Sequence, residues 1–175
     1  MRRIYTYLSL LIGITLLFTA CEKSELHSEL ENSEILWSQF KINNKNSYQY
    51  THTTLSWTGW RTSTTIEVNG GKITKREFNG YMISYYNNVP DTTKKIEIIE
   101  LNEDVNKHPE LMKDKTLDEI YQLARSHADN QQLNGRFVFE SKNNGLISRS
   151  GIFDDDCVDD CFDGINITEI KPLNP

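Results

Sequence analysis

The alternation of apolar and polar positions along this chain of 175 residues predicts a protein rich in β-strands. A period of two, with many Thr, Tyr and Ile residues, is typical of strands that bury one face. The segments that fit are 48–55, 62–68, 72–78, 81–86, 94–101, 136–141, 146–153 and 164–170. Asn69-Gly70-Gly71 and Lys142–Gly145 predict hairpin turns, because their residues tolerate positive φ. Trp57–Trp60 is expected to be a turn, and 87–93, which contains Pro90, a loop.

Two segments have the 3.6-residue period of amphipathic helices. Ser33 is a good N-cap ahead of the first apolar stripe, so a short helix is predicted from Ser33 to about Asn43. The second helix is predicted to begin with Thr116-Leu117-Asp118-Glu119, a capping box in which the threonine and glutamate side chains each bond the other residue's amide. Its apolar stripe continues to about His127 or Ala128.

The order helix, strand, hairpin occurs twice and predicts an α+β fold. We expect an antiparallel sheet of about six or more strands with two main helices. The turn sequences 69–76 and 143–149 are alike, which would fit two helix-plus-meander halves, although hairpin turns often share such residues without a repeat. Segment 102–115 is ambiguous and is expected to be a loop with one helical turn.

The first 20 residues have the layout of a secretory signal peptide. Arg2 and Arg3 precede an apolar stretch that ends at Phe18 and is shorter than the roughly 20 residues needed to span a membrane. Ala20 and Cys21 follow, which resembles the lipobox of bacterial lipoproteins, although leucine is usual where Phe18 stands. We predict cleavage before Cys21 and acylation of this cysteine. The alternative is an ordinary signal peptide with an incidental cysteine.

Acylation of Cys21 would anchor the protein in the bacterial cell envelope, on the periplasmic or surface face of the outer membrane. Residues 21–32 are rich in Glu and Ser and are expected to form a solvated, lipidated tether, which leaves 33–175 as a single domain. Because the leader contains Arg2 and Arg3 and no acidic residue, its removal takes the formal charge from −6 to −8. Such an acidic chain excludes nucleic acid as a partner, since phosphate binding needs a basic face.

The densest chemical feature is the acidic segment around the two remaining cysteines. Cys157 and Cys161 form an even pair in an oxidising compartment, so a disulfide is expected. The carboxylates near them are Asp154, Asp155, Asp156, Asp159, Asp160 and Asp163. They could form a solvated turn closed by the disulfide, or supply oxygen ligands to Ca²⁺, although an EF-hand is excluded because Ile170 stands where its bidentate Glu belongs. Zinc is disfavoured, because no histidine is near in the sequence.

An aromatic group around the first hairpins is a candidate binding surface. Its members are Trp57, Trp60, Tyr81, Tyr85 and Tyr86. Exposed Trp and Tyr rings bury much area at low entropic cost when they contact a protein or a sugar. The alternative is that these rings cover a sheet edge or join the core.

No motif for catalysis, for a metal or for phosphate binding is present in the sequence. Four histidines are scattered and are expected to be ordinary surface or strand residues: His27, His52, His108 and His127. The leading hypothesis is therefore a non-enzymatic module, without a cofactor, that binds a protein or a glycan. A calcium-dependent structural or adhesive domain and an uncharacterised enzyme are the alternatives.

Several short motifs occur in an order that resembles a family of small bacterial lipoproteins classed only as a domain of unknown function. The motifs are Trp37 on the opening helix, Tyr48-x-Tyr50, Ile66-x-Val68-x-x-Gly71-x-Ile73, Thr116–Tyr121, Gly145-Leu146-Ile147 and the segment from Cys157 to Ile167. The resemblance covers about Glu34 to Ile170. It implies an exported lipoprotein with an α+β fold and no established activity. Parts of the family have cysteines where this chain has Thr53 and Thr54, so any role of those cysteines is absent here.

Overall fold

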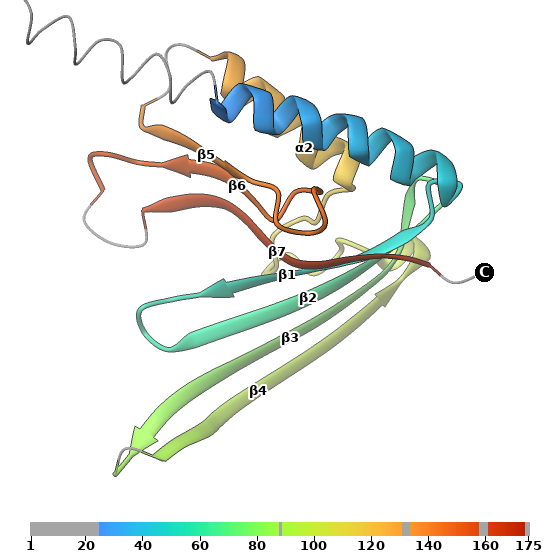
Figure 1. The fold of residues 1–175 in the computed structure, drawn as a ribbon. Coiled ribbons are helices and arrows are strands. Elements are labelled where there is room, and N and C mark those ends of the chain that lie inside the picture. Colours follow the sequence, from blue (N-terminus) through green and yellow to red (C-terminus); the bar gives the residue numbers. More distant parts are fainter. Residues whose placement is uncertain (1–24, 88, 131–133, 158–160, 174–175) are drawn as a thin grey trace, which may run out of the picture.

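The computed structural model describes residues 25–87, 89–130, 134–157 and 161–173. In this part of the chain, two helices pack on one face of a seven-stranded antiparallel sheet, so the predicted α+β fold is confirmed (Figure 1). Cys21 and the leader lie outside the described residues, and the acylation of Cys21 stays a prediction. Within the described ranges, no helix has both the length and the apolar character needed to cross a membrane.

The sheet consists of two meanders that meet at its centre. The strands are β1 (Tyr48–Leu55), β2 (Trp60–Asn69), β3 (Lys72–Tyr86), β4 (Val89–Leu101), β5 (Arg136–Glu140), β6 (Arg149–Phe153) and β7 (Phe162–Pro172). Their order across the sheet is β4-β3-β2-β1-β7-β6-β5, and every neighbouring pair is antiparallel. The first meander therefore runs outward from β1, and the second runs inward to β7. One helix precedes each meander, as the order of elements suggested.

The two helices lie side by side and antiparallel on the same face of the sheet (Figure 1). They span residues 25–43 and α2 (Leu117–Asp129). Ion pairs link them along their length: Glu34 pairs with Arg125, and Lys41 Nζ lies 2.7 Å from Asp118 Oδ1. A short 3-10 helix, η1 (Asn102–Asp104), opens the loop between β4 and α2, as expected for this segment.

Aromatic side chains fill the space between the helices and the sheet. The Trp37 ring stacks on Tyr121 with ring centroids 5.9 Å apart and meets Tyr48 edge-on at 5.0 Å. All three rings are nearly fully buried, and each removes roughly 150–250 Å² of surface from water. Leu30 and Ile147 are fully buried in the same cluster. The core therefore joins the first helix, α2, β1 and the segment between β5 and β6.

The first helix begins earlier than predicted. Ser33, the expected N-cap, lies in the middle of the helix, and its buried hydroxyl is 2.7 Å from the Tyr121 hydroxyl. Leu30, Ser33 and Trp37 recur every three or four residues and face the core. Residues 25–32 are therefore helical and not part of a solvated tether. The Glu and Ser residues of this segment led to the prediction of a tether. Its apolar positions form a stripe that stabilises the helix only when it packs against α2.

Two segments predicted as a turn and a loop belong to strands. Trp60 opens β2, so the turn spans only 56–59. The segment around Pro90 is part of β4, because a strand at the edge of a sheet needs no amide donor on its outer side. The β2–β3 hairpin is confirmed, with φ of 57° at Gly70 and 82° at Gly71, which glycine adopts without strain.

The sheet divides where β1 and β7 separate (Figure 1). β7 pairs with β1 over residues 167–172 and with β6 over 162–166. β1 pairs with β2 along its whole length, but with β7 only up to His52, where a β-bulge interrupts the ladder. Residues 53–55 (the β1 arm) and 162–166 (the β7 arm) therefore diverge from one point.

Candidate functional site

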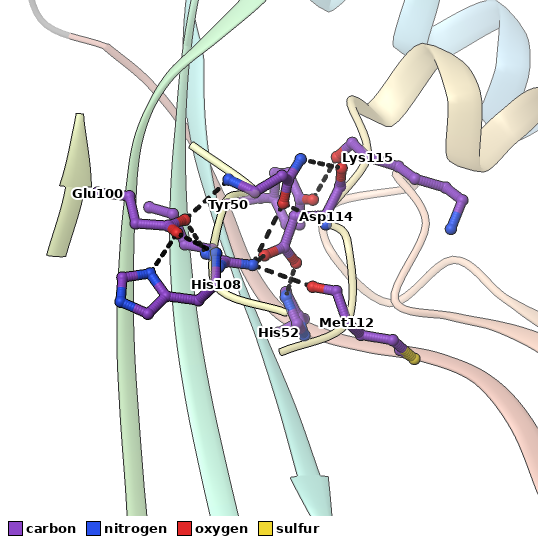
Figure 2. Close-up of polar contacts among 9 residues, drawn as sticks. Tyr50, His52, Glu100, His108, Met112, Asp114 and Lys115 are labelled. Atoms are coloured by element: carbon purple, nitrogen blue, oxygen red, sulfur yellow. Dashed lines mark hydrogen bonds and ion pairs between the residues drawn. The ribbon is translucent and has the colours of Figure 1, made fainter. Parts of the chain in front are cut away.

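The loop between β4 and α2, residues 102–116, crosses the face of the sheet that the helices cover, and buried charges hold it there (Figure 2). Arg76 on β3 stands opposite Glu100 on β4, with Arg76 Nε 2.6 Å from Glu100 Oε2. Arg76 Nη1 lies 3.1 Å from Asp114 Oδ2 and donates to the Met112 carbonyl. The side chains of Arg76, Glu100 and Asp114 are 1%, 1% and 7% exposed. One cation thus joins two strands to the loop.

Two histidines complete this charge cluster, which comprises Arg76, Glu100, Asp114, His52 and His108. His52 Nε2 lies 2.6 Å from Asp114 Oδ1, and His108 Nδ1 lies 2.6 Å from Glu100 Oε1 (Figure 2). Because an ionised carboxylate only accepts hydrogen bonds, each of these ring nitrogens carries a proton. His52 is 12% exposed and His108 43% exposed. Each carboxylate is therefore bonded to Arg76 and to one histidine.

Glu100 is held in its ionised form. Burial raises the pKa of its carboxyl, but hydrogen bonds from the His108 ring, from the amides of Asn106 and His108 and from Arg76 outweigh burial and lower the pKa to about 2. The Asn106 side chain also accepts from the Asp114 amide at 2.9 Å and donates to the Asp114 carbonyl at 3.1 Å. The backbone of the loop is thus part of the hydrogen-bond network around the charges.

Two tyrosines of β1 hold the end of the loop and the start of α2. The Tyr50 hydroxyl donates to the Lys115 carbonyl, and the Leu117 amide donates to the Tyr48 hydroxyl at 2.9 Å. Burial raises the pKa of both phenols well above its usual value, so both stay neutral. The loop is therefore fixed at its end by hydroxyls and in its middle by charges.

A cleft of about 330 Å³ opens beside the charge cluster, at the point where the sheet divides. Its walls are residues 52–54 of β1, 112–115 of the loop, Ile120, Leu123 and His127 of α2, 150–152 of β6 and 163–166 of β7. His52 and Asp114 line the cleft, so the charge cluster forms part of its wall. The volume falls at the lower end of the range for ligand sites.

In enzymes, a histidine oriented by a carboxylate can activate a nucleophile that is hydrogen-bonded to the histidine, and the His52–Asp114 pair supplies the first two of these three groups. Among the residues that the structure describes, no serine, threonine or cysteine hydrogen-bonds to the ring of His52 or of His108. His127, on the α2 wall, has a buried Nδ1 without a hydrogen-bond partner in the described part of the chain. The cleft thus presents fixed polar groups that can hold a ligand.

The predicted pairing of Cys157 with Cys161 is found: the two residues form a disulfide, with their Cα atoms 5.3 Å apart. The aspartates that are described near it are all exposed: Asp154, Asp155, Asp156 and Asp163. Asp159 and Asp160 lie outside the described residues. The described ranges contain no group of three or more potential metal-ligating side chains, and a calcium site in this segment stays a prediction.

The structure separates the aromatic residues of the candidate binding surface. Trp57, in the turn after β1, is 73% exposed. Trp60 and Tyr81 lie on opposite faces of the sheet, because Tyr81 stands opposite the residue after Trp60 and neighbouring residues of a strand alternate between faces. Tyr85 and Tyr86 belong to β3, but their side chains lie outside the description. Trp60 and Tyr81 therefore cannot belong to one continuous patch.

The charge cluster was not predicted from the sequence, although strand alternation contains a signal for three of its five residues. Phe78 is a core-facing residue of β3, so Arg76, two positions earlier, must face inward as well. Ile98 and Glu100 have the same relation on β4. Charges at inward positions of two predicted strands are exceptional and point to a buried pair. His52 has the same relation to the buried Tyr50 on β1, whereas Asp114 and His108 lie in a loop, where no alternation applies.

Comparison with known proteins yields nothing: no family model, no curated protein and no solved structure matches this chain. The cleft and the charge cluster are therefore the basis for a function.

Proposed function

We propose that this chain is an exported lipoprotein of the bacterial envelope, and that its folded domain binds a protein or a glycan without catalysing a reaction. The leader and the position of Cys21 support the anchor. Residue 25 is already helical, so only three residues separate Cys21 from the described helix. At about 3.5 Å per extended residue, the domain would lie within roughly 15 Å of the acylated cysteine.

The cleft between the two arms is the observation that carries the binding function. The charge cluster fixes the loop on one side of it, and α2, packed on the core, forms another side. Its wall combines the apolar Ile120 and Leu123 with the polar His52 and His127, a mixture typical of ligand sites. The turn with the exposed Trp57 follows directly from the β1 arm and would add area for a partner.

The anchor is tested in a bacterial host by replacing Cys21 with Ser. The variant should remain as an uncut precursor or leave the membrane fraction, whereas the native protein should have the mass of an acylated chain that begins at Cys21. The control is the double variant Cys157→Ser, Cys161→Ser, which should still partition with membranes. A Cys21→Ser protein found in the membrane fraction at the mature mass would refute the anchor.

The binding function is tested with the full-length protein, extracted in detergent and applied to one array of envelope glycans and one array of peptides. Leu123→Arg places a charge in the cleft and should weaken binding at least roughly tenfold. Ile42→Arg, at an apolar position that is 77% exposed and does not line the cleft, is the matched control and should bind like the native protein. If the native protein binds neither array, the domain is not a protein- or glycan-binding module.

A further inference from the structure

The β7 arm is an open strand edge. In an antiparallel ladder, residues alternate between bonding to one neighbouring strand and bonding to the other. The Ile167 amide donates to the Ser148 carbonyl and the Asp154 amide to the Cys161 carbonyl, so the odd-numbered residues of β7 bond toward β6. The residues of this arm whose N–H and C=O groups point to the cleft side are therefore Phe162, Gly164 and Asn166.

The β1 arm, on the other side of the gap, has the same property. At the end of the β1–β2 hairpin, the Ser56 amide donates to the Trp60 carbonyl at 2.9 Å, so the even-numbered residues of β1 bond toward β2. The backbone groups of Thr53 and Leu55 point away from β2, toward the gap. Within the described ranges, neither arm pairs with a strand on its gap side. Free amides and carbonyls in a row are a template for an added strand.

We infer that the cleft binds an extended polypeptide segment, which adds as a strand along the β7 arm with the β1 arm as the opposite wall. This inference rests on the proposed binding function and names its ligand class. A peptide backbone in extended form presents donors and acceptors at the spacing of the β7 arm, as in other cases of strand addition. Glycan hydroxyls do not alternate donors and acceptors at a fixed spacing. The open backbone groups of the β7 arm therefore favour a polypeptide over a glycan.

The outer edges of the sheet are less suited to strand addition. β4, at one edge, includes Pro90, Lys95 and Glu97, and a proline with charges is typical of an edge protected against pairing. β5, at the other edge, is only five residues long. By contrast, every residue whose backbone points into the gap is uncharged: Thr53, Leu55, Phe162, Gly164 and Asn166.

Every second side chain of the bound segment would face α2. Ile120, Leu123 and His127 form that wall of the cleft. Side chains along a strand alternate between its two faces, so the segment should need apolar residues at every second position and tolerate most residues between them.

The test is selection of a random library of short linear peptides on the full-length protein in detergent. Alanine substitution in a selected peptide should weaken binding with a period of two. N-methylation of an amide that faces the β7 arm removes one hydrogen bond and should weaken binding roughly tenfold, whereas N-methylation of the next residue should have little effect.

On the protein side, Asn166→Pro removes an amide donor that faces the gap and should weaken a selected peptide roughly tenfold. Asn166→Thr keeps the amide and should bind within about twofold of the native protein. Should Asn166→Pro fail to fold, amide exchange of the native protein answers the question. Exchange at Gly164 and Asn166 should slow at least roughly tenfold when peptide binds, while exchange at Gly70, in the turn between β2 and β3, should not.

Four outcomes would overturn the inference. Peptides that bind without alternate sensitivity to N-methylation, or that leave the Gly164 and Asn166 amides unprotected, would disprove strand addition and leave the binding function standing. Binding to the glycan array alone would have the same meaning. Binding to neither peptides nor glycans would remove the proposed function as well.

Discussion

Arg76 and Glu100 are buried charges that stand opposite each other on neighbouring strands. Removing a charge from water costs several kcal/mol, and a partner offsets this cost only when geometry and further hydrogen bonds are favourable. Asp114, His52 and His108 supply those bonds, and they come from the loop between β4 and α2 and from β1. We therefore expect the cluster to select one position of the loop, and with it one wall of the cleft.

Replacing Glu100 with Gln should lower the free energy of unfolding by about 3–5 kcal/mol, because Arg76 would stay buried with a weaker counter-charge. The measurement is urea unfolding at pH 7, followed by far-UV circular dichroism. Glu97→Gln, at a 60% exposed position of the same strand, is the control and should cost less than about 1 kcal/mol. Equal effects of the two substitutions would contradict a stabilising role for the pair.

The same variants test the pH dependence of stability. In the folded protein, the hydrogen bonds to Glu100 outweigh its burial and lower its pKa from the ordinary value of 4.5 to about 2. A carboxyl with a lowered pKa stabilises the fold above its unfolded pKa, and this contribution disappears as the pH falls from about 4.5 toward 2. The native protein should lose on the order of 3 kcal/mol from this group in that window. Glu100→Gln should lack that loss, and Glu97→Gln should retain it.

At the scale of elements, α2 is fixed at its first turn by local and distant bonds. Within the capping box, the Glu119 amide donates to Thr116 Oγ1 at 3.3 Å, and the Thr116 amide donates to Glu119 Oε2 at 2.7 Å. The Tyr48 hydroxyl accepts from Leu117, the next residue of the helix. The start of α2 therefore depends on signals that are readable in the sequence and on one that only the folded sheet supplies.

Thr116→Ala should lower the free energy of unfolding by about 1 kcal/mol, because the Glu119 amide loses its acceptor and the box loses one of its two bonds. Chemical denaturation at neutral pH measures this difference. Thr92→Ala, at an exposed position of β4, removes a similar hydroxyl outside any cap and should change stability by less than about 0.5 kcal/mol. No difference between the two variants would mean that the capping box makes no measurable contribution to the free energy of unfolding.

Local patterns in the sequence predicted most of the elements, and the misses have physical causes. The β1 strand, the Gly70-Gly71 hairpin and the capping box depend on neighbouring residues, and all three were predicted correctly. Ser33 was misplaced because its hydroxyl is satisfied by Tyr121, 88 residues away, and not by the amides of a helix end. The strand around Pro90 was missed because tolerance of proline depends on being at the sheet edge, which the local sequence does not encode.

The candidate site was less predictable than the fold. The cleft exists because β7 leaves β1 at His52 and continues beside β6, and this choice depends on the order of strands across the whole sheet. The His52–Asp114 bond joins residues 62 positions apart, so no spacing rule could reveal it. The cysteine pair, separated by only four positions, was predictable because its geometry is local.

At the scale of the whole molecule, the first helix connects the proposed anchor to the core. It supplies Leu30 and Trp37 to the buried cluster and pairs with α2 through Glu34. If Cys21 is acylated as proposed, only three residues lie between the lipid and this helix. The domain, and the cleft with it, would then be held close to the membrane surface.

This arrangement predicts that the first helix unfolds together with the sheet, and two tryptophans test it. Trp37 is 3% exposed, and its Nε1 donates to Asp118 of α2 at 2.9 Å, whereas Trp57 is 73% exposed. Trp37→Ala leaves a cavity between the helices and the sheet and should lower the free energy of unfolding by about 3–5 kcal/mol. Trp57→Ala removes the same side chain from the surface and should cost less than about 0.5 kcal/mol.

Urea unfolding followed by circular dichroism, which does not rely on tryptophan emission, compares the two variants. A loss of helical signal in Trp37→Ala that precedes the loss of sheet signal would show instead that the first helix is a separate unit, and that the anchor is attached to a segment that can detach from the core.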